Sequence, residues 1–147
     1  MMNTLDSFAA LFDPRGRMSR RSYHRRLIGM LLLFFVSGSV AILAASLDAR
    51  FTGLAIVGVT AAGTAAVLVV ATIRRLHDRG RTGWWMLPDV ITTLAGFAPL
   101  ETLADVYPWP VIAATLAMTG FNLWFFVETI CRRGTPGPNR YGPEPER

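Results

Sequence analysis

The chain has 147 residues, of which 52% are hydrophobic and only 17% are charged. That charge content is too low to cover the surface of a soluble domain of this size. The net charge is +5 and arises from 15 arginines with no lysine. These arginines flank apolar runs and form no recognisable nucleic-acid reading motif, so nucleic acid is not expected as a partner. One cysteine excludes an internal disulfide.

Residues 1–26 form a polar and basic N-terminal segment. Within it, Leu5, Phe8 and Phe12 are spaced three and four apart, which places them on one face of a helix. We expect a short amphipathic helix on the cytoplasmic surface of the membrane, ended by Asp13 and Pro14.

Two long apolar runs follow. Residues 27–47 contain no charge, and at about 1.5 Å per residue they cover roughly 30 Å, the thickness of a bilayer core. Residues 48–50 make a short connection, and residues 51–73 are a second uncharged run. This pattern predicts two spans in a tight antiparallel hairpin.

A basic loop at residues 74–83 comes next, in which Gly80 is expected to end the second helix. Residues 84–100 are a third apolar stretch, which either crosses with a kink or re-enters the membrane because Pro88 lies near its start. Residues 109–130 are the fourth predicted span. Residues 131–147 form a polar tail rich in proline and glycine. The predicted fold is therefore all-α, a polytopic four-helix transmembrane bundle over residues 27–130.

The charge distribution predicts the orientation. In the four-span layout, residues 1–26, 74–83 and 131–147 lie on one side and hold 14 of the 15 arginines. The positive-inside rule then places both termini in the cytoplasm. If residues 84–100 did not cross, the tail and its arginines would lie outside, so the charge distribution favours four crossings.

Two carboxylates lie within the apolar stretches. Asp89 and Glu128 are costly at membrane depth and are expected to face a partner. Glu128 lies four residues before Arg132, a favourable helical spacing for an ion pair. One interpretation is that both carboxylates pair with the arginine-rich face. The alternative is an ion or proton path that also uses Asn122, Thr92 and Thr93.

No catalytic, metal or cofactor site is predicted. His77 and Asp78 are adjacent, as in some metal phosphohydrolases, but the chain has only two histidines and one cysteine to complete a ligand set. Pairing of Asp78 with nearby arginines is the simpler interpretation. Gly58, Ala62 and Ala66 recur at every fourth position and could form a face for self-association.

Three separate motifs carry a family resemblance. They are GRMSRRSY at residues 16–23, RRLHDRGRTGWW at residues 74–85 and GTPGPNRYG at residues 134–142. Together they resemble the bacterial inner-membrane proteins grouped as domain of unknown function 805. The resemblance implies a small multi-span protein of the inner membrane, and no known reaction or cofactor. One departure is His24, where a tryptophan commonly follows the tyrosine of the first motif.

We call these three motifs together the cap, because the four-span layout puts all of them on the cytoplasmic side. Arginine suits such a cap, since its planar fork contacts a carboxylate or phosphate through two bonds. We expect a non-enzymatic module whose cap binds anionic lipid headgroups or a partner protein. The candidate residues are Arg17, Arg20, Arg21, Tyr23, Arg74, Arg75, His77, Asp78, Arg81, Trp84, Trp85, Asn139, Arg140 and Tyr141.

Two alternatives remain open. One is a small transporter or channel subunit in which Asp89 and Glu128 couple to the movement of an ion. The other is a membrane enzyme acting on lipid, with His77 and Asp78 at the interface.

Overall fold

The computed structural model describes residues 10–146. Over this range the regular elements are all helical, apart from one isolated bridge between Asn139 and Gly142. The all-helical fold class is thus confirmed. The amphipathic helix expected around Leu5, Phe8 and Phe12 falls mainly on residues 1–9, which lie outside the described range.

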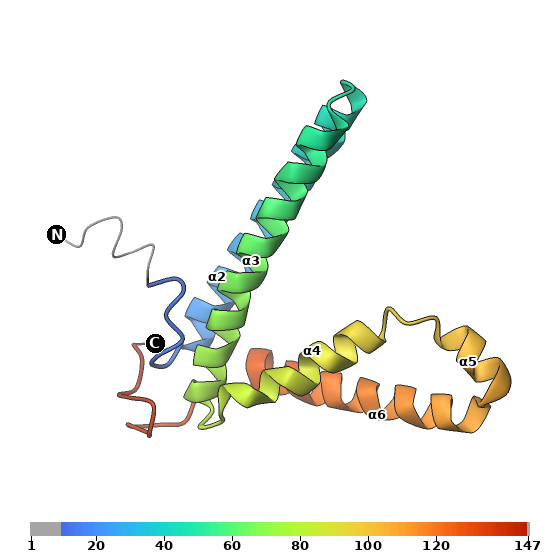
Figure 1. Ribbon diagram of the computed structural model, residues 1–147. Helices are drawn as coiled ribbons and strands as arrows, with labels where there is room; N and C mark the ends of the chain where they lie inside the picture. Colours follow the sequence, from blue (N-terminus) through green and yellow to red (C-terminus); the bar gives the residue numbers. More distant parts are fainter. Residues whose placement is uncertain (1–9, 147) are drawn as a thin grey trace.

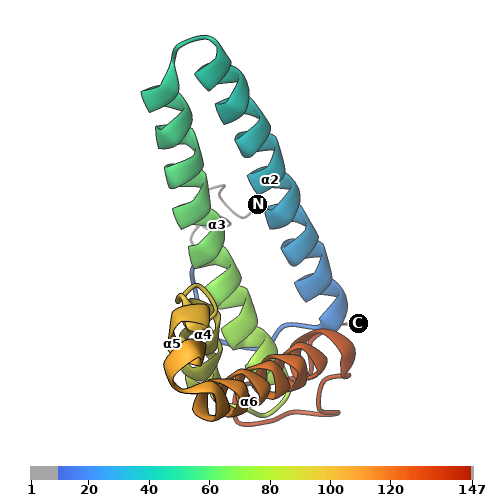
Figure 2. The ribbon, with the colours of Figure 1, turned by 90° about the vertical axis from the view of Figure 1, so that its right-hand side faces the viewer.

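The first two long helices form the expected antiparallel hairpin. They are α2 (Arg20–Ser46) and α3 (Arg50–Asp78), and they lie side by side along their length (Figure 2). Ser19 caps α2, because its hydroxyl accepts a hydrogen bond from the backbone N–H of Ser22. The connection turns tightly through Asp48, whose φ is 62°.

The two helices come closest near the turn. A Cβ atom added to Gly53 would lie 2.7 Å from the backbone oxygen of Ala41, so glycine permits this approach. The small-residue face proposed for self-association is on a different side of α3. Gly58, Ala62 and Ala66 are all exposed, and they point away from the hairpin interface.

Helix α3 continues five residues beyond the second predicted span. Nothing in residues 74–78 interrupts it, and it ends in a Schellman motif. Gly80 has a φ of +71° and donates to the carbonyl of His77, while Arg81 donates to the carbonyl of Leu76. The role predicted for Gly80 is confirmed. The first part of the predicted basic loop is therefore helical, which puts Arg75 and Asp78 on one helix face.

The third apolar stretch is not one helix. It consists of a short 3₁₀ turn (η1, Gly83–Trp85) and α4 (Met86–Ala95), and the chain then bends before α5 (Leu100–Val106). At about 1.5 Å per residue, the 10 residues of α4 cover only about 15 Å, half of a bilayer core.

The last long helix is α6 (Pro108–Phe126), continued by a π-helical turn (η2, Val127–Cys131). Figure 1 shows α4 and α6 side by side in an arm that leaves the base of the α2–α3 hairpin at a large angle. Within residues 10–146, three helices are long and apolar enough to cross a membrane: α2, α3 and α6 with its π turn. The described residues thus form two splayed helical pairs, and the predicted count of four spanning helices is not confirmed.

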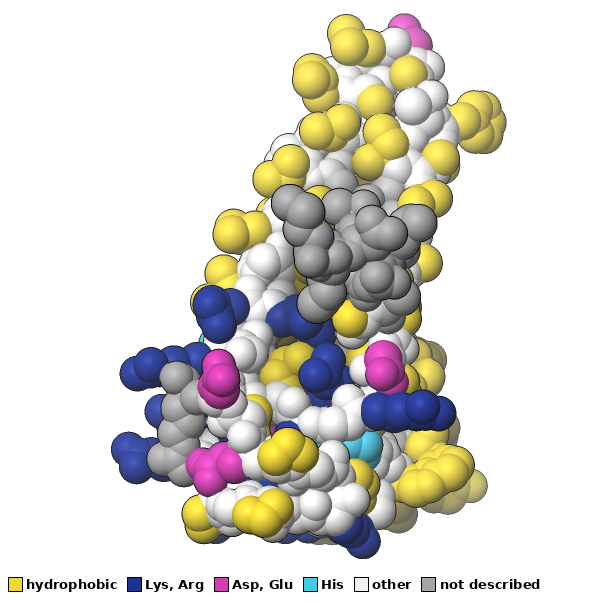
Figure 3. All heavy atoms as spheres, turned by 90° about the vertical axis from the view of Figure 1, so that its left-hand side faces the viewer, with side chains coloured by type: hydrophobic (Ala, Val, Ile, Leu, Met, Phe, Trp, Pro, Cys, Tyr) yellow, Lys and Arg dark blue, Asp and Glu magenta, His cyan; other side chains and the backbone are white. Residues whose placement is uncertain are grey.

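Buried residues concentrate where the two helical pairs meet. Met18, Tyr23 and Ala71 form a small apolar cluster there, with Ile130 packed against it. Arg75, Leu76 and Glu128 are the largest fully buried side chains. Figure 3 shows apolar side chains over the upper hairpin and arginines gathered at its lower end. The long helices bury little of their surface within the chain, as expected of surfaces that lipid covers.

Candidate functional site

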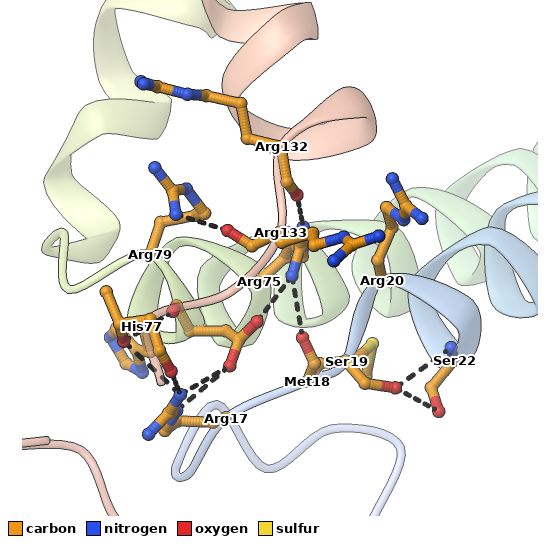
Figure 4. A network of polar contacts seen from close by, with 12 residues as sticks. Arg17, Met18, Ser19, Arg20, Ser22, Arg75, His77, Arg79, Arg132 and Arg133 are labelled. Carbon is orange, nitrogen blue, oxygen red and sulfur yellow. Dashed lines mark hydrogen bonds and ion pairs between the residues drawn. The ribbon is translucent and has the colours of Figure 1, made fainter. Parts of the chain in front are cut away.

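The three motifs of the cap, far apart in sequence, are joined by hydrogen bonds at the end of α3. Figure 4 shows residues of the first two motifs together with Arg132 and Arg133, which directly precede the third. The first is fastened to α3 by a backbone hydrogen bond of 3.0 Å from Met18 N to the carbonyl of Arg74. The third is fastened to the end of α3 by a bond of 2.8 Å from Thr135 N to the carbonyl of Asp78. The Thr135 hydroxyl donates to the same carbonyl at 3.0 Å.

Asp78 is the first of two carboxylates around which the arginines are arranged. Its Oδ1 lies 2.9 Å from Arg17 Nη2, and its Oδ2 lies 2.5 Å from Arg75 Nη1. The side chains of Asp78, Arg17 and Arg75 are 3%, 1% and 0% exposed, respectively. A buried charge is tolerated only when it is paired and hydrogen-bonded, and these three groups meet that condition together.

Arg17 and Arg75 use their remaining donors on backbone carbonyls of the C-terminal part. Arg17 donates to the carbonyls of Gly137 and Thr135, both at 2.6 Å. Arg75 donates to the carbonyl of Thr129 at 2.8 Å and to that of Arg132. The two buried arginines therefore join the N-terminal segment, α3, the end of α6 and the tail into one unit.

Glu128 is the second central carboxylate. Its Oε1 lies 3.1 Å from Arg79 Nε and 2.9 Å from Arg81 Nε, and its Oε2 lies 3.0 Å from Arg132 Nη1. Glu128 is 1% exposed. The ion pairing predicted for this residue is confirmed, and it includes the predicted pair with Arg132. The π-helical turn carries Glu128 to this position, and turns of this kind often occur at functional sites.

Two tryptophans flank the Arg81 guanidinium. Its central carbon lies 5.4 Å from the Trp85 ring centroid and 4.8 Å from that of Trp124. Arg81 therefore combines an ion pair with cation–π contacts, and it ties the start of the α4–α6 arm to the end of that arm. Trp84 directly precedes Trp85 in the sequence. It is 75% exposed, and its ring is not in cation–π contact with Arg81.

His77 is held by the tail. Its ring stacks on Tyr141 with centroids 3.8 Å apart and an angle of 5° between the ring planes. Its Nδ1 lies 3.1 Å from the carbonyl oxygen of Gly16, and its own carbonyl accepts from Asn139 Nδ2 at 3.0 Å. Arg140 lies over the other ring of this pair, with 4.8 Å from its guanidinium carbon to the Tyr141 centroid.

Two aromatic residues of α2 reach neighbouring helices. The Tyr23 hydroxyl lies 3.2 Å from Thr72 Oγ1. His24 Nε2 lies 3.0 Å from the carbonyl oxygen of Ile130. His24, which stands where the family pattern commonly has tryptophan, thus makes a polar contact with the π-helical turn that continues α6.

Asp89, the other carboxylate of the apolar stretches, is not ion-paired with this unit. No hydrogen bond or ion pair to the Asp89 carboxylate occurs within residues 10–146, so the predicted pairing of Asp89 with the arginines is absent there. Nearby, Thr92 donates to Asn122 Oδ1 at 2.7 Å, which links α4 to α6. Across the described chain, no three His, Cys, Asp or Glu side chains gather where they could hold a metal ion.

Several residues of this site were not among the candidates for the cap. Arg79 binds Glu128 beside the predicted partner Arg132, and Thr135 binds the end of α3. Gly134 was quoted only as part of a motif, yet a Cβ atom there would lie 2.0 Å from Asp78 Oδ2. Each of these residues lies inside or beside a motif of the cap, and apart from the four-residue spacing of Arg132 from Glu128, no local pattern indicates its partner.

Comparison with known proteins agrees with this arrangement of motifs. A family model described as "Protein of unknown function (DUF805)" matches residues 11–143. The chain belongs to the DUF805 family. That range contains all three motifs of the cap, and the predicted resemblance is confirmed.

Two relatives of this DUF805 protein come from Escherichia coli K12. One, named "Uncharacterized protein YiiR", is 31% identical over 140 residues, which cover 90% of this chain and 85% of the relative. The other, named "Inner membrane protein YhaH", is 28% identical over 134 residues, which cover 90% of this chain and 86% of the relative. No solved structure matches this chain.

Proposed function

We propose that this DUF805 protein is a non-enzymatic, multi-pass protein of the bacterial inner membrane whose cytoplasmic side binds anionic lipid headgroups. The contacts in and around the cap divide the arginines gathered there into two groups. Arg17, Arg75, Arg79, Arg81 and Arg132 are committed to Asp78 and Glu128 and serve to hold the fold together. A ligand of the cap must therefore be recognised by other arginines.

One pair of arginines carries the proposal. Arg26 Nη1 and Arg74 Nε are buried and have no hydrogen-bond partner. The two side chains are close enough for their charges to repel each other. Two adjacent cations with buried, unsatisfied N–H groups are unfavourable unless an anion joins them. An anion with several acceptor oxygens, such as a phosphodiester, would satisfy both.

The position of this pair favours a lipid as the source of the anion. Arg26 directly precedes the first uncharged apolar run, which begins at Leu27, and Arg74 directly follows the second, which ends at Ile73. Both residues therefore lie at headgroup level on the side where arginines gather. An arginine near an anionic membrane surface contributes about 1 kcal/mol of attraction.

The same contacts support an even number of membrane crossings. Arg81 lies just before the α4–α6 arm, and Glu128 lies in the turn at its end. These two side chains are ion-paired, so the two ends of the arm lie together. Residues 83–131 thus start and finish on one side, whether the arm crosses and returns or lies within one leaflet. With the α2–α3 hairpin, this arrangement supports a topology in which both termini lie on the arginine-rich side, which the positive-inside rule assigns to the cytoplasm.

The contacts give less support to the two alternatives. A transporter coupled through Asp89 and Glu128 would need Glu128 to bind and release an ion, but three arginines engage it. An enzyme using His77 and Asp78 would need both groups near a substrate. His77 is stacked on Tyr141, and the Asp78 carboxylate is engaged by two buried arginines.

Lipid binding to the purified full-length protein tests the proposal. Native mass spectrometry in detergent would compare phosphatidylglycerol with the zwitterionic phosphatidylcholine. Arg26→Gln and Arg74→Gln should each weaken phosphatidylglycerol binding roughly fivefold, from about 1 kcal/mol per arginine. Arg50→Gln is the matched control, since it removes the same charge from the far end of the hairpin. Equal losses in all three variants, or no preference for the anionic lipid, would reject the proposal.

A further inference from the structure

A second cationic site lies on the cap, apart from the Arg26–Arg74 pair. It is a pocket of about 270 Å³ between the first turn of α2 and the tail. Arg20 and Arg21 line it from α2, and Arg133 lines it from the segment that follows η2. Figure 4 shows the Arg133 side chain extending toward that of Arg20. Three positive side chains from two parts of the chain thus converge on one cavity.

The arginines that line the pocket outnumber the acids that could balance them. Asp78 reaches the pocket wall, but Arg17 and Arg75 already balance its charge. Glu144 also lines it and accepts a hydrogen bond of 2.7 Å from the backbone N–H of Gly137. Three arginines set against the Glu144 carboxylate leave the pocket with a net positive charge.

The donors of the three arginines are largely unused. Within residues 10–146, neither the Arg21 nor the Arg133 guanidinium has a hydrogen-bond or ion-pair partner. Arg20 Nη1 donates one hydrogen bond of 2.9 Å to the carbonyl of Cys131. Arg20 and Arg21 are also the first residues of a 27-residue helix, whose positive N-terminal end adds to the field in the pocket.

We infer that this pocket binds a phosphate group carried by a small phosphomonoester. Forked guanidinium donors match the several oxygens of a phosphate, and a dianion balances the excess positive charge. At about 30 Å³ per water molecule, 270 Å³ holds the equivalent of roughly nine waters, which suits a phosphate with a short substituent. It is smaller than the pockets that enclose drug-sized ligands.

The phosphomonoester could be free in solution or part of a lipid such as phosphatidic acid. Arg20 precedes Leu27 by seven residues, so the pocket lies about 10 Å along α2 from the start of the apolar run. Headgroup regions add only about 5–8 Å on each side of the hydrocarbon core. This position favours the soluble source.

Thermal unfolding of the full-length protein in detergent, titrated with inorganic phosphate and with glycerol 3-phosphate, tests the inference. Chloride at matched ionic strength is the salt control. We expect a saturable rise in unfolding temperature with both phosphate probes. Arg21→Gln and Arg133→Gln should each weaken the apparent affinity roughly tenfold, the loss expected for a charge-assisted hydrogen bond.

Two controls separate this site from others. Arg25→Gln removes an exposed charge that neighbours α2's first turn but does not line the pocket, and it should bind phosphate like the unmodified chain. The combined Arg26→Gln and Arg74→Gln variant should also retain phosphate binding, so failure of the lipid proposal would leave this one intact. A rise of the same size in every variant, or one matched by chloride, would overturn the inference.

The source of the phosphomonoester is decided by a separate measurement. Phosphate titrations would be repeated in nanodiscs containing either phosphatidic acid or phosphatidylglycerol. Binding that is unchanged by phosphatidic acid supports a soluble ligand. Competition by phosphatidic acid that is lost in Arg133→Gln would overturn the soluble assignment and place the phosphomonoester in the lipid.

Discussion

Replacing Asp78 by asparagine keeps the size of the side chain but removes the charge that two buried guanidinium groups share. Arg17 and Arg75 are 1% and 0% exposed, so water cannot replace the lost carboxylate without opening the cap. Removing one partner of a buried ion pair costs about 3–5 kcal/mol. For a chain of about this size, each kcal/mol lowers the midpoint of thermal unfolding by roughly 2–4 °C. We therefore expect a drop of roughly 6–20 °C.

The assay is the thermal unfolding of the detergent-solubilised protein, followed by tryptophan fluorescence. Asp89→Asn is the control, because it makes the same chemical change at a carboxylate with no hydrogen bond or ion pair in the described range. It should lower the midpoint far less. Trypsin cleavage after Arg140 gives a local readout, and it should accelerate in Asp78→Asn because the tail loses its support through Arg17. Equal midpoints for the two variants would refute the idea that Asp78 organises the cap.

Three further substitutions test the packing. Gly53→Ala should push α2 and α3 apart near their turn and lower the unfolding temperature. Gly58→Ala on the same helix is the control and should be tolerated, because its added methyl group has no neighbouring atom within 4 Å. Equal unfolding midpoints for the two variants would contradict the close approach of the helices. Gly134→Ala places a methyl group 2.0 Å from a buried carboxylate oxygen, so it should destabilise the cap as Asp78→Asn does, and a stable, protease-resistant tail would show otherwise. Tyr141→Ala should cost about 1 kcal/mol from the lost stack on His77 and Tyr141→Phe almost nothing, a difference measurable as denaturant midpoints.

Local sequence patterns were sufficient to predict the parts that depend on local physics. Long uncharged runs must be helical in lipid, because a helix satisfies its own backbone hydrogen bonds. Gly80 could be assigned to the end of α3, since a positive φ costs glycine less than any other residue. The pair of Glu128 with Arg132 followed from a spacing of four residues within one helix.

The sequence was less informative about the third apolar stretch. Hydropathy identifies a segment that avoids water, but it does not say whether one helix runs through it. Residues 83–100 contain a 3₁₀ turn, the ten-residue helix α4 and a turn that follows Ala95. Where the sequence predicted a four-helix bundle, the structure has two helical pairs that extend from the cap in different directions (Figures 1 and 2).

By itself, the sequence determined that the protein is helical, is apolar enough to span a membrane and gathers 14 of its 15 arginines in three terminal or loop segments. It could not distinguish one arginine from another, because all of them share the same charge and similar surroundings in the sequence. Only the tertiary structure separated the arginines that pair with Asp78 and Glu128 from those that we propose bind a ligand. The physical reason is distance along the chain: Arg17 meets Asp78 across 61 residues and Arg81 meets Glu128 across 47. Pairings over such separations depend on how the helices pack.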